Sequence, residues 1–527
     1  MTGHGGGASG RVSRRDLLRA LGVGAAGLAA TTSGATVGGT GTRAAYAASP
    51  AAQSPPSGRF GRMFRLPSFA SPSPRLTEAL TDIGKPGGLL DARDHLAAGP
   101  VALIVDPAQS INNRDNLSAT AGTTFVGQFI DHDITFDVQS RLGRPTAPES
   151  VANARAARLD LESVYGGGPV TSPHLYDAAD RAKLRVEGGG RFEDLPRTAE
   201  GAAIIADPRN DQSIMLAGLH CAVMLFHNRC VDRIRDEGTA DTAEVFAAAR
   251  QLTTWHFQWL VLHEIVPTFI GQAMTKEILS GGRSYYRPSA GAFIPVEFQA
   301  GAYRMGHSLV RPSYRANLGG AHGPAFFGFI FDPTLAPSPD PDDLIGGCRA
   351  PRRFVGWQTF FDFGDGEVRR SKRIDMKLST PLFNLPLFAI ASGDAPTVLP
   401  QRTLLRHVTW MLPSGQAVAR AMGAPVLPSS AFSELRLYGL GLESSTPLFY
   451  YVLREAEVME DGVHLGPVGG RIVGEVLIGL LELDPDGFLA RPGWRPTLPQ
   501  RSGAVTGQFT MTDFLAFAGV DPASRGE

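Results

Sequence analysis

The stretch GQFIDHD at residues 127–133 places a histidine between two carboxylates on a segment that has the pattern of a buried helix. Apolar residues repeat every four positions across this segment, which predicts one apolar helical face. Gln128, Asp131 and His132 are spaced i, i+3 and i+4, so they share another face of the same helix. Polar groups in a protein core cost free energy unless they find partners. We therefore expect a polar or metallic group to lie against these three side chains.

The composition is that of a globular protein. The 527 residues are 43% hydrophobic and 19% charged, and the formal net charge is −1. No extended basic run is present, so the sequence gives no electrostatic support for nucleic-acid binding. Three cysteines (Cys221, Cys230 and Cys348) are too few and too scattered for a disulfide framework or a cysteine-rich metal site.

The N-terminus has the pattern of a twin-arginine signal peptide. The motif SRRDLL at residues 13–18 precedes a weakly apolar stretch at 20–30 and an A-x-A site at 45–47. The apolar stretch is far shorter than a membrane span, which argues against an uncleaved anchor. We therefore predict a signal peptide at residues 1–47, read by the twin-arginine export machinery, and a secreted or extracytoplasmic protein without a stable membrane span.

The rest of the chain has mostly helical periodicity. A flexible lead-in rich in Pro, Ser and Ala is expected at residues 48–84, and one large domain at 85–527. Alternating strand patterns are scarce, so we predict a mainly α-helical fold with long loops and little β-structure. The expected helices lie at residues 212–236, 242–265, 292–311, 401–421, 445–458 and 468–483.

A second histidine lies on a separate apolar stripe. His307 is the only strongly basic residue among positions 296, 300, 303, 307 and 310, which repeat at helical spacing. A single histidine on an apolar face is more often a hydrogen-bonded core residue than a ligand. With His132 on another buried helix, however, one histidine could bind a metal while the other works on its opposite side.

The motif DPRNDQ at residues 207–212 precedes a long apolar helix. Its simplest interpretation is a helix start with Asn210 or Asp211 as the N-cap, which leaves Arg209 free for another role. Four further histidines lie on two helices at seven-residue intervals, but no Glu-x-x-His pair accompanies them. We therefore interpret these four as structural rather than as a di-metal site: His220, His227, His256 and His263.

The order of the motifs resembles the bacterial branch of the animal-type haem peroxidase superfamily, which includes myeloperoxidase and the cyclooxygenases. The motifs are GQFIDHDITFD, RLDLESVYGGGP, DPRNDQSIMLAGLHCAVMLFHNR, AYRMGHSLVRPSY and LPSGQAVARAMG. The resemblance spans roughly residues 85–520. Five motifs in one order make a coincidental match improbable, although each alone is weak.

The resemblance implies haem b as the cofactor and gives each matching residue a role. His132 corresponds to the distal histidine, Gln128 to its polar neighbour, Arg209 to the distal arginine and His307 to the proximal iron ligand. The other implied residues are Asp131, which can be ester-linked to haem in mammalian members, Arg304 near the proximal side, and the calcium ligands Asp133, Asp160, Glu162 and the carbonyl of Arg158.

Four positions depart from the family pattern. Two are in the calcium loop, where Ala156 replaces a threonine ligand and Glu162 a serine of mammalian members; the other two are Gln212 and Thr403. Gln212 replaces the glutamate that forms a second haem ester in mammalian members, so we expect haem to be held non-covalently. Thr403 replaces the asparagine that accepts a hydrogen bond from the proximal histidine, which places peroxidase strength in question. Because carboxylates near His132 would raise its pKa, we also hypothesise that calcium at Asp133 keeps this histidine neutral.

The resemblance implies a peroxidase that reduces hydrogen peroxide and oxidises a small donor such as a phenol or a halide. Two alternatives stay open. A fatty-acid dioxygenase of the same superfamily needs a tyrosine three residues before the proximal histidine, where this chain has Arg304; Tyr303 lies one residue further back and is expected to point elsewhere. A haem-binding scaffold or adhesion protein with vestigial catalysis is the other alternative. The sequence leaves the donor and the oligomeric state open.

Overall fold

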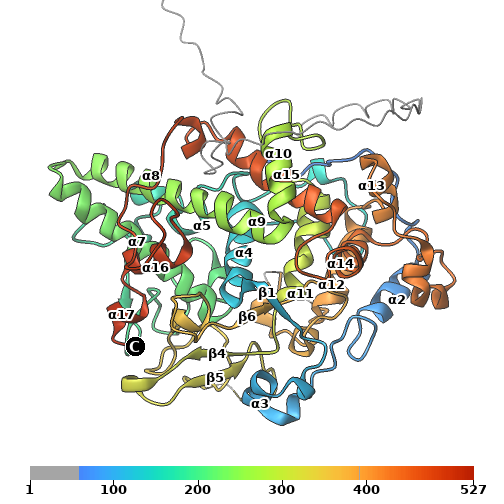
Figure 1. Cartoon of the computed structure of the whole chain (residues 1–527), viewed down its shortest axis with the longest axis horizontal. Helices are drawn as coiled ribbons and strands as arrows, with labels where there is room; N and C mark the ends of the chain where they lie inside the picture. The colour runs from blue at the N-terminus through green and yellow to red at the C-terminus, as the bar shows by residue number, and fades with distance from the viewer. Residues whose placement is uncertain (1–57, 337, 391, 394) are drawn as a thin grey trace, which may run out of the picture.

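The predicted polar-faced helix is α4 (Ala121–Ile134), which lies near the centre of the molecule (Figure 1). The computed structural model describes residues 58–527 apart from residues 337, 391 and 394. The apolar face of α4 is buried: Phe125 packs against Tyr314 and Phe360, and Phe129 packs against Phe257. The helix prediction at residues 127–133 is therefore confirmed.

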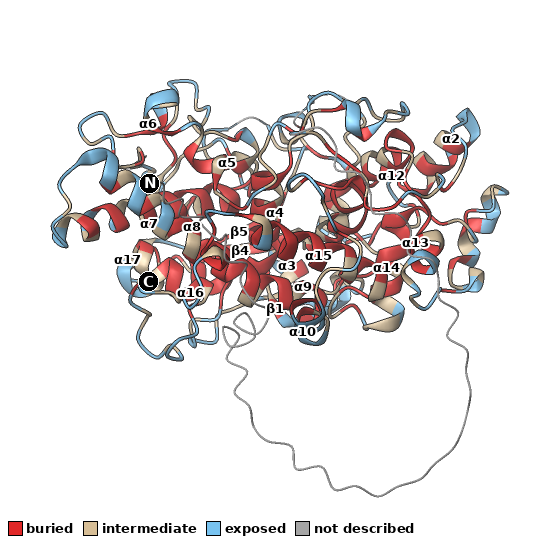
Figure 2. Ribbon diagram, turned by 90° about the horizontal axis from the view of Figure 1, so that it is seen from above, coloured by how far each residue is buried: buried red, intermediate tan, exposed pale blue. Residues whose placement is uncertain are grey.

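The described chain is mainly helical, as predicted. Buried residues fill the middle of the molecule and exposed residues lie at its periphery (Figure 2). The longer helices are α2 (Pro74–Ile83), α7 (Ile214–Asp236), α8 (Thr242–Leu260), α10 (Gln272–Gly281), α12 (Leu399–Thr409), α13 (Gly415–Met422), α14 (Leu448–Met459), α15 (Pro467–Leu483) and α16 (Met511–Ala518). The shorter ones are α3 (Gly99–Val105), α5 (Glu162–Tyr165), α6 (Gly168–Thr171), α9 (Val266–Ile270), α11 (Gly306–Leu309) and α17 (Pro522–Arg525).

The strands of the described residues form three small antiparallel pairs. They are β1 (Asp115–Thr120) with β6 (Arg370–Lys372), β2 (Glu187–Gly188) with β3 (Glu193–Asp194), and β4 (Ser313–Asn317) with β5 (Phe326–Phe329). In register, Asp115 faces Lys372 and Ser313 faces Phe329. The β1–β6 pair contacts α4, and β6 also contacts α11, so it braces two helices that carry predicted site residues.

Two of the expected helices are interrupted. The run at 401–421 is split into α12 and α13, because Pro413 cannot continue a helix and Ser414 caps the second one. The run at 292–311 becomes the π-helix η7 (Glu297–Gly301), the turn η8 (Ala302–Met305) and α11. Gly301 permits this irregular backbone to approach α14, since a Cβ there would lie 2.7 Å from Leu448 Cδ2.

The expected lead-in is wrong for residues 58–84. Phe60, Leu80 and Ile83 are fully buried, and α2 packs against α12. The backbone N–H groups of Met63 and Phe64 donate to the carboxylate of buried Glu297 at 2.9 and 3.1 Å. Apolar residues in a Pro- and Ser-rich segment thus join the core. The predicted signal peptide lies outside the described residues.

Helix α7 is, among the described residues, the one long and apolar enough to cross a membrane by length and composition. In the fold it is a core helix, because 78% of its apolar window is buried. It contacts α4, α8 and α16.

Helix α4 can approach α9 closely because residue 127 is a glycine. A Cβ on Gly127 would lie 2.7 Å from Cζ of the buried Phe269 ring. We expect Gly127→Ala to lower the free energy of unfolding by about 1–3 kcal/mol through overpacking, measured by urea denaturation. Gly281→Ala is the matched control, since Gly281 ends a helix and faces open space. An equal effect of both substitutions would contradict this prediction.

Candidate functional site

One cavity of about 260 Å³ collects the residues that the sequence singled out for the active site. Its walls come from α4, the turn η5 (Pro208–Asp211), η8, α11 and α12, which are distant in sequence. The predicted residues that line it are Gln128, Asp131, His132, Arg209, Arg304, His307 and Thr403. The structure thus gathers His132, His307 and Arg209 at one site.

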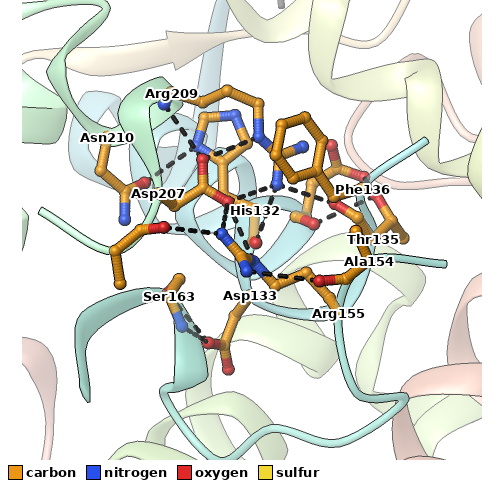
Figure 3. A network of polar contacts seen from close by, with 12 residues as sticks. His132, Asp133, Thr135, Phe136, Ala154, Arg155, Ser163, Asp207, Arg209 and Asn210 are labelled. Carbon is orange, nitrogen blue, oxygen red and sulfur yellow. Dashed lines mark hydrogen bonds and ion pairs between the residues drawn. The ribbon is translucent and has the colours of Figure 1, made fainter. Parts of the chain in front are cut away.

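His132 is held through its Nδ1 atom (Figure 3). This nitrogen donates a hydrogen bond to Oδ1 of Asn210 at 2.9 Å. Behind it, Nδ2 of Asn210 donates to Nδ1 of His220 at 3.1 Å. All three side chains are buried. The arrangement leaves Nε2 of His132 as the ring nitrogen with a free lone pair, which is the form needed for a base.

Arg209 is fixed by a buried carboxylate. Its Nε and Nη2 atoms donate to the two oxygens of Asp207 at 2.9 and 2.7 Å, and Nη2 also donates to the carbonyls of His132 and Thr135 at the end of α4. Arg155 donates to the same carboxylate from the other side (Figure 3). No acceptor for Nη1 is found among the described residues, so this group is available to a ligand in the cavity.

Burial and the charge of Arg209 lower the pKa of His132 to about 4. Asp207 and Asp131 act in the opposite direction, as predicted for carboxylates, but they are outweighed. The histidine is therefore neutral near pH 7 without any ion at Asp133. Burial, which the sequence alone did not reveal, thus lowers this pKa already in the ion-free chain, and a role of calcium in keeping His132 competent stays a prediction.

The Thr403 hydroxyl does contact His307. Thr403 Oγ1 donates to the carbonyl of Leu399, four residues earlier in α12, at 3.1 Å. The same oxygen lies 3.2 Å from Nδ1 of His307 and can accept its N–H. A threonine thus supplies the acceptor that the family's asparagine would provide, and Nε2 of His307 keeps its lone pair for a ligand.

The remaining polar residues join the two sides of the cavity. Nη1 of Arg304, on η8, lies 3.9 Å from Oδ2 of Asp131 on α4. Gln128 Nε2 donates to Oε1 of Gln212 at 3.1 Å, and Gln212 Nε2 donates to the carbonyl of Ala389 at 2.7 Å. Gln212, where an ester-forming glutamate was expected from the family pattern, instead connects α4 to the segment that borders the cavity at 385–390.

Tyr303 borders the cavity, so the expectation that it points elsewhere is wrong. Its hydroxyl donates to the carbonyl of Gly127 at 3.0 Å, and its ring stacks on Phe298. Burial is the main cause that raises the pKa of this phenol well above its usual value, and the charge of Asp131 is the second cause.

The predicted calcium residues lie close together, but their oxygens are occupied. Asp133 accepts hydrogen bonds from the backbone N–H groups of Leu161 and Ser163 and from the Ser163 hydroxyl. Burial and the neighbouring Asp160 raise the pKa of Asp133. Glu162 turns to the N–H of residue 156, and the side chain of Arg158 faces Asp484 and Asp486. The described residues contain no group of three or more His, Cys, Asp or Glu placed to hold a metal. Calcium stays a prediction.

Three of the four histidines on α7 and α8 have protein partners. Tyr165 donates to His227, which donates to the carbonyl of Ala182. His256 donates to the carbonyl of Leu252, and His220 accepts from Asn210. His263 follows α8 in the π-helix η6 (Val261–Ile265), where its ring packs on Trp259. The contacts of His220, His227 and His256 agree with a structural role, whereas both ring nitrogens of His263 are buried without a hydrogen-bond partner among the described residues.

Sequence reasoning missed the residues that support His132 and Arg209. Asp207, rather than Asn210 or Asp211, accepts the N–H that starts the turn η5, and Ser213 caps α7. The spacing of Asp207 and Arg209 was a usable signal, since an Asx turn with an i+2 arginine brings the two charges together. No sequence signal linked Asn210 and His220 to His132, because these contacts depend on how α7 packs against α4.

Solved structures of a peroxidase and of two fatty acid alpha-dioxygenases share this fold. Peroxidase A from Dictyostelium discoideum has a TM-score of 0.52 at 14% identity, covering 83% of this chain and 87% of that one. The fatty acid alpha-dioxygenase of Oryza sativa has a TM-score of 0.56 at 15% identity, covering 83% and 76%. The enzyme of Arabidopsis thaliana has a TM-score of 0.56 at 13% identity, covering 89% and 77%. At these identities the likeness concerns the fold alone.

A match to a protein-family model is more specific than the likeness of fold. Residues 141–322 match the model described as animal haem peroxidase, a segment that contains Arg209 and His307 but begins after His132 and ends before Thr403. The peroxidasin homologue pxn-1 of Caenorhabditis elegans is 21% identical over 180 residues, which are 31% of this chain and 14% of that protein. The resemblance to the animal haem peroxidase superfamily predicted from the motifs is thus confirmed, and haem is the cofactor expected of this family.

The hydroxyl of Thr403 should contribute measurably to stability. Thr403→Val keeps the shape of the side chain but removes the acceptor for the N–H of His307. A buried donor left without a partner costs about 1–3 kcal/mol, so we expect the free energy of unfolding of the haem-free protein to fall by about that amount. Thr403→Ser retains the hydroxyl. Apart from the loss of its methyl contacts, its free energy of unfolding should stay within about 0.5 kcal/mol of the native value. Equal values for both variants would exclude the contact.

Stability should fall as the pH drops below 6.5. Burial lowers the pKa of His220, His227, His256 and His407 from 6.5 to about 4 each. Between these pH values the unfolded chain binds more protons than the folded one, so acidification favours unfolding; above pH 6.5 these groups add no pH dependence. Urea denaturation at a series of pH values measures this slope, and His256→Gln should reduce it. Burial raises the pKa of Glu264 and of Glu455 to about 7, and these carboxyls act in the opposite direction over the same range. A slope that is unchanged in His256→Gln would therefore contradict the prediction.

Proposed function

We propose that this protein is a haem peroxidase that reduces hydrogen peroxide and oxidises a small-molecule donor. The observation that carries this proposal is that a neutral histidine with a free Nε2, an arginine with a free Nη1 and a second histidine with a free Nε2 line one cavity. Haem, when bound, supplies the redox-active iron and its capacity to oxidise a second substrate.

The residues of the cavity fit such a cofactor. His307 would bind the iron through Nε2, since Thr403 holds its Nδ1 atom. The side-chain oxygen of Gln299, which also lines the cavity, is buried and has no hydrogen-bond partner among the described residues. An orphaned polar atom of this kind in a cavity wall is expected where a ligand completes the site. Arg304 and Asp131, at opposite sides, are further candidates for contacts with the cofactor; non-covalent binding is our default.

His132 would move the proton of the reaction. Its Nε2 lone pair would accept a proton from hydrogen peroxide and return it to the departing oxygen, while haem, when bound, would supply the two electrons that O–O cleavage requires. General acid–base catalysis of this kind contributes about 10²–10⁴-fold to a rate. The low pKa of the ring supports this role, because the acceptor must be neutral before the peroxide arrives.

Arg209 would stabilise the negative charge that develops on the departing oxygen. Its Nε and Nη2 atoms are held by Asp207 and by two carbonyls of α4, so the guanidinium needs little reorganisation during the reaction. Gln128 would add a polar contact on the same side. A fixed charge of this type acts most strongly in a cavity of low polarity, because the surroundings screen it less.

A peroxidase is favoured over a fatty-acid dioxygenase by the position of the tyrosine. The phenol of Tyr303 is one residue out of place for the superfamily's radical tyrosine and is committed to the carbonyl of Gly127. Oxygen uptake with a fatty acid in the absence of peroxide would favour the dioxygenase, whereas peroxide-dependent oxidation of a phenol favours the peroxidase. Export through the twin-arginine route and a calcium ion near Asp133 are parts of the same proposal.

Substitutions of the two sides of the cavity should have different effects. We expect Arg209→Leu to slow the reaction with hydrogen peroxide by about 10²–10³-fold while haem is retained, as followed by stopped-flow absorbance of the Soret band. We expect His307→Ala to lose haem, as measured by the Soret absorbance after gel filtration. His407→Phe is the control for a buried histidine on α12 that does not line the cavity. Full colour and turnover in both site variants would overturn the proposed function.

A further inference from the structure

Asn210 and His220 form a buried chain of hydrogen bonds behind His132. Both residues are at most 1% exposed, and His132 is 4% exposed, so solvent has little access to replace these contacts. Asn210 Oδ1 accepts from His132 Nδ1 at 2.9 Å, and Asn210 Nδ2 donates to His220 Nδ1 at 3.1 Å. Neither side chain belongs to the lining of the cavity.

The amide of Asn210 couples the protonation of the two imidazole rings. One end of an amide only accepts and the other only donates, and a neutral imidazole carries a single N–H. With the oxygen turned to His132, that ring must carry its proton on Nδ1. With the nitrogen turned to His220, that ring must leave its own Nδ1 unprotonated. The opposite arrangement would require the amide to rotate and both rings to change tautomer together.

Packing holds this chain of contacts in place. His220 is on α7, which contacts both α4 and the turn η5. The His220 ring meets the Phe129 ring edge-on, with centroids 6.3 Å apart, and Phe129 belongs to the buried face of α4. Asn210 is anchored by its backbone N–H, which donates to the carbonyl of Asp207 at 3.0 Å. The three groups are thus supported from three separate elements.

We propose that Asn210 and His220 are positioning residues that hold His132 in the tautomer with its proton on Nδ1. This tautomer leaves the Nε2 lone pair free toward the cavity; the other tautomer places a hydrogen there and cannot accept a proton. The inference rests on the proposed function for its catalytic meaning, although the tautomer itself is a property of the chain. An imidazole orientation set by a second group is a known way to prepare a histidine for catalysis.

The first test uses the haem-loaded protein and cyanide binding, which is followed by absorbance and needs no donor substrate. Hydrogen cyanide must give up its proton to bind ferric haem, so a distal base accelerates its association. We expect Asn210→Leu to slow association at least about tenfold, because His132 then favours the tautomer that has lost its Nε2 lone pair. Asn210→Asp retains an acceptor for Nδ1–H of His132, and His220 can then donate its own Nδ1–H to the second carboxylate oxygen, so the rate should stay within about threefold.

The second test measures the tautomer without haem. The ¹⁵N chemical shifts of ring-labelled histidine distinguish protonated from unprotonated nitrogen, and His132→Gln assigns the signals. We expect Nε2 of His132 to be unprotonated in the native protein and to become protonated in Asn210→Leu. His220→Phe, which keeps the ring packing but removes the acceptor, should produce a mixture of the two tautomers. His227→Phe, an equivalent change on the same helix, should leave the His132 signals unchanged.

The two readouts separate the inference from the proposed function. Native ¹⁵N shifts and native cyanide rates in both Asn210→Leu and His220→Phe would overturn the inference. A protein that binds no haem, or a His132→Leu variant that binds cyanide at the native rate, would overturn the proposed function while the ¹⁵N measurement still decides the tautomer.

Discussion

The buried carboxylate of Asp207 is the contact on which the His132 side of the cavity depends. It is fully buried and accepts hydrogen bonds from two arginines, one that lines the cavity and one, Arg155, that lies behind it. The charges of Arg209 and its other neighbours overcome the effect of burial and lower the pKa of this carboxyl. A buried charge is tolerated when it is paired and hydrogen-bonded, and removing either partner would leave an uncompensated charge. The pair also holds the arginine against the end of α4, which carries His132.

The two histidines of the cavity are held in the same tautomer by chemically different hydrogen-bond partners. Each ring is fixed through Nδ1, His132 by an amide oxygen and His307 by a hydroxyl, so each retains an Nε2 lone pair. Burial keeps both rings neutral: it lowers the pKa of His132 to about 4 and that of His307 to about 3. A neutral imidazole can act either as a metal ligand or as a base. The proposed peroxidase requires one histidine in each of these roles, on two sides of one cavity.

The departures from the family pattern are accommodated locally. Thr403 reaches His307 because its hydroxyl is oriented by a helical carbonyl four residues earlier, which leaves the oxygen lone pairs for the ring. Gln212 cannot form an ester, but its amide has both a donor and an acceptor, and it uses them to connect Gln128 with the 385–390 segment. Both substituted side chains thus find hydrogen-bond partners within the cavity wall.

The sequence by itself determined the helix at residues 127–133, its apolar and polar faces and the mainly helical fold, because helical periodicity is a local property of the chain. The candidate residues of the cavity came from the motif resemblance. Only the tertiary structure decided the pKa of His132, the Asn210–His220 contacts and the packing of residues 58–84 into the core. Each of these depends on burial or on the approach of segments far apart in sequence. Asp133 is an example. The motif shows that this residue is a carboxylate, but it does not show that the backbone N–H groups of Leu161 and Ser163 donate hydrogen bonds to it.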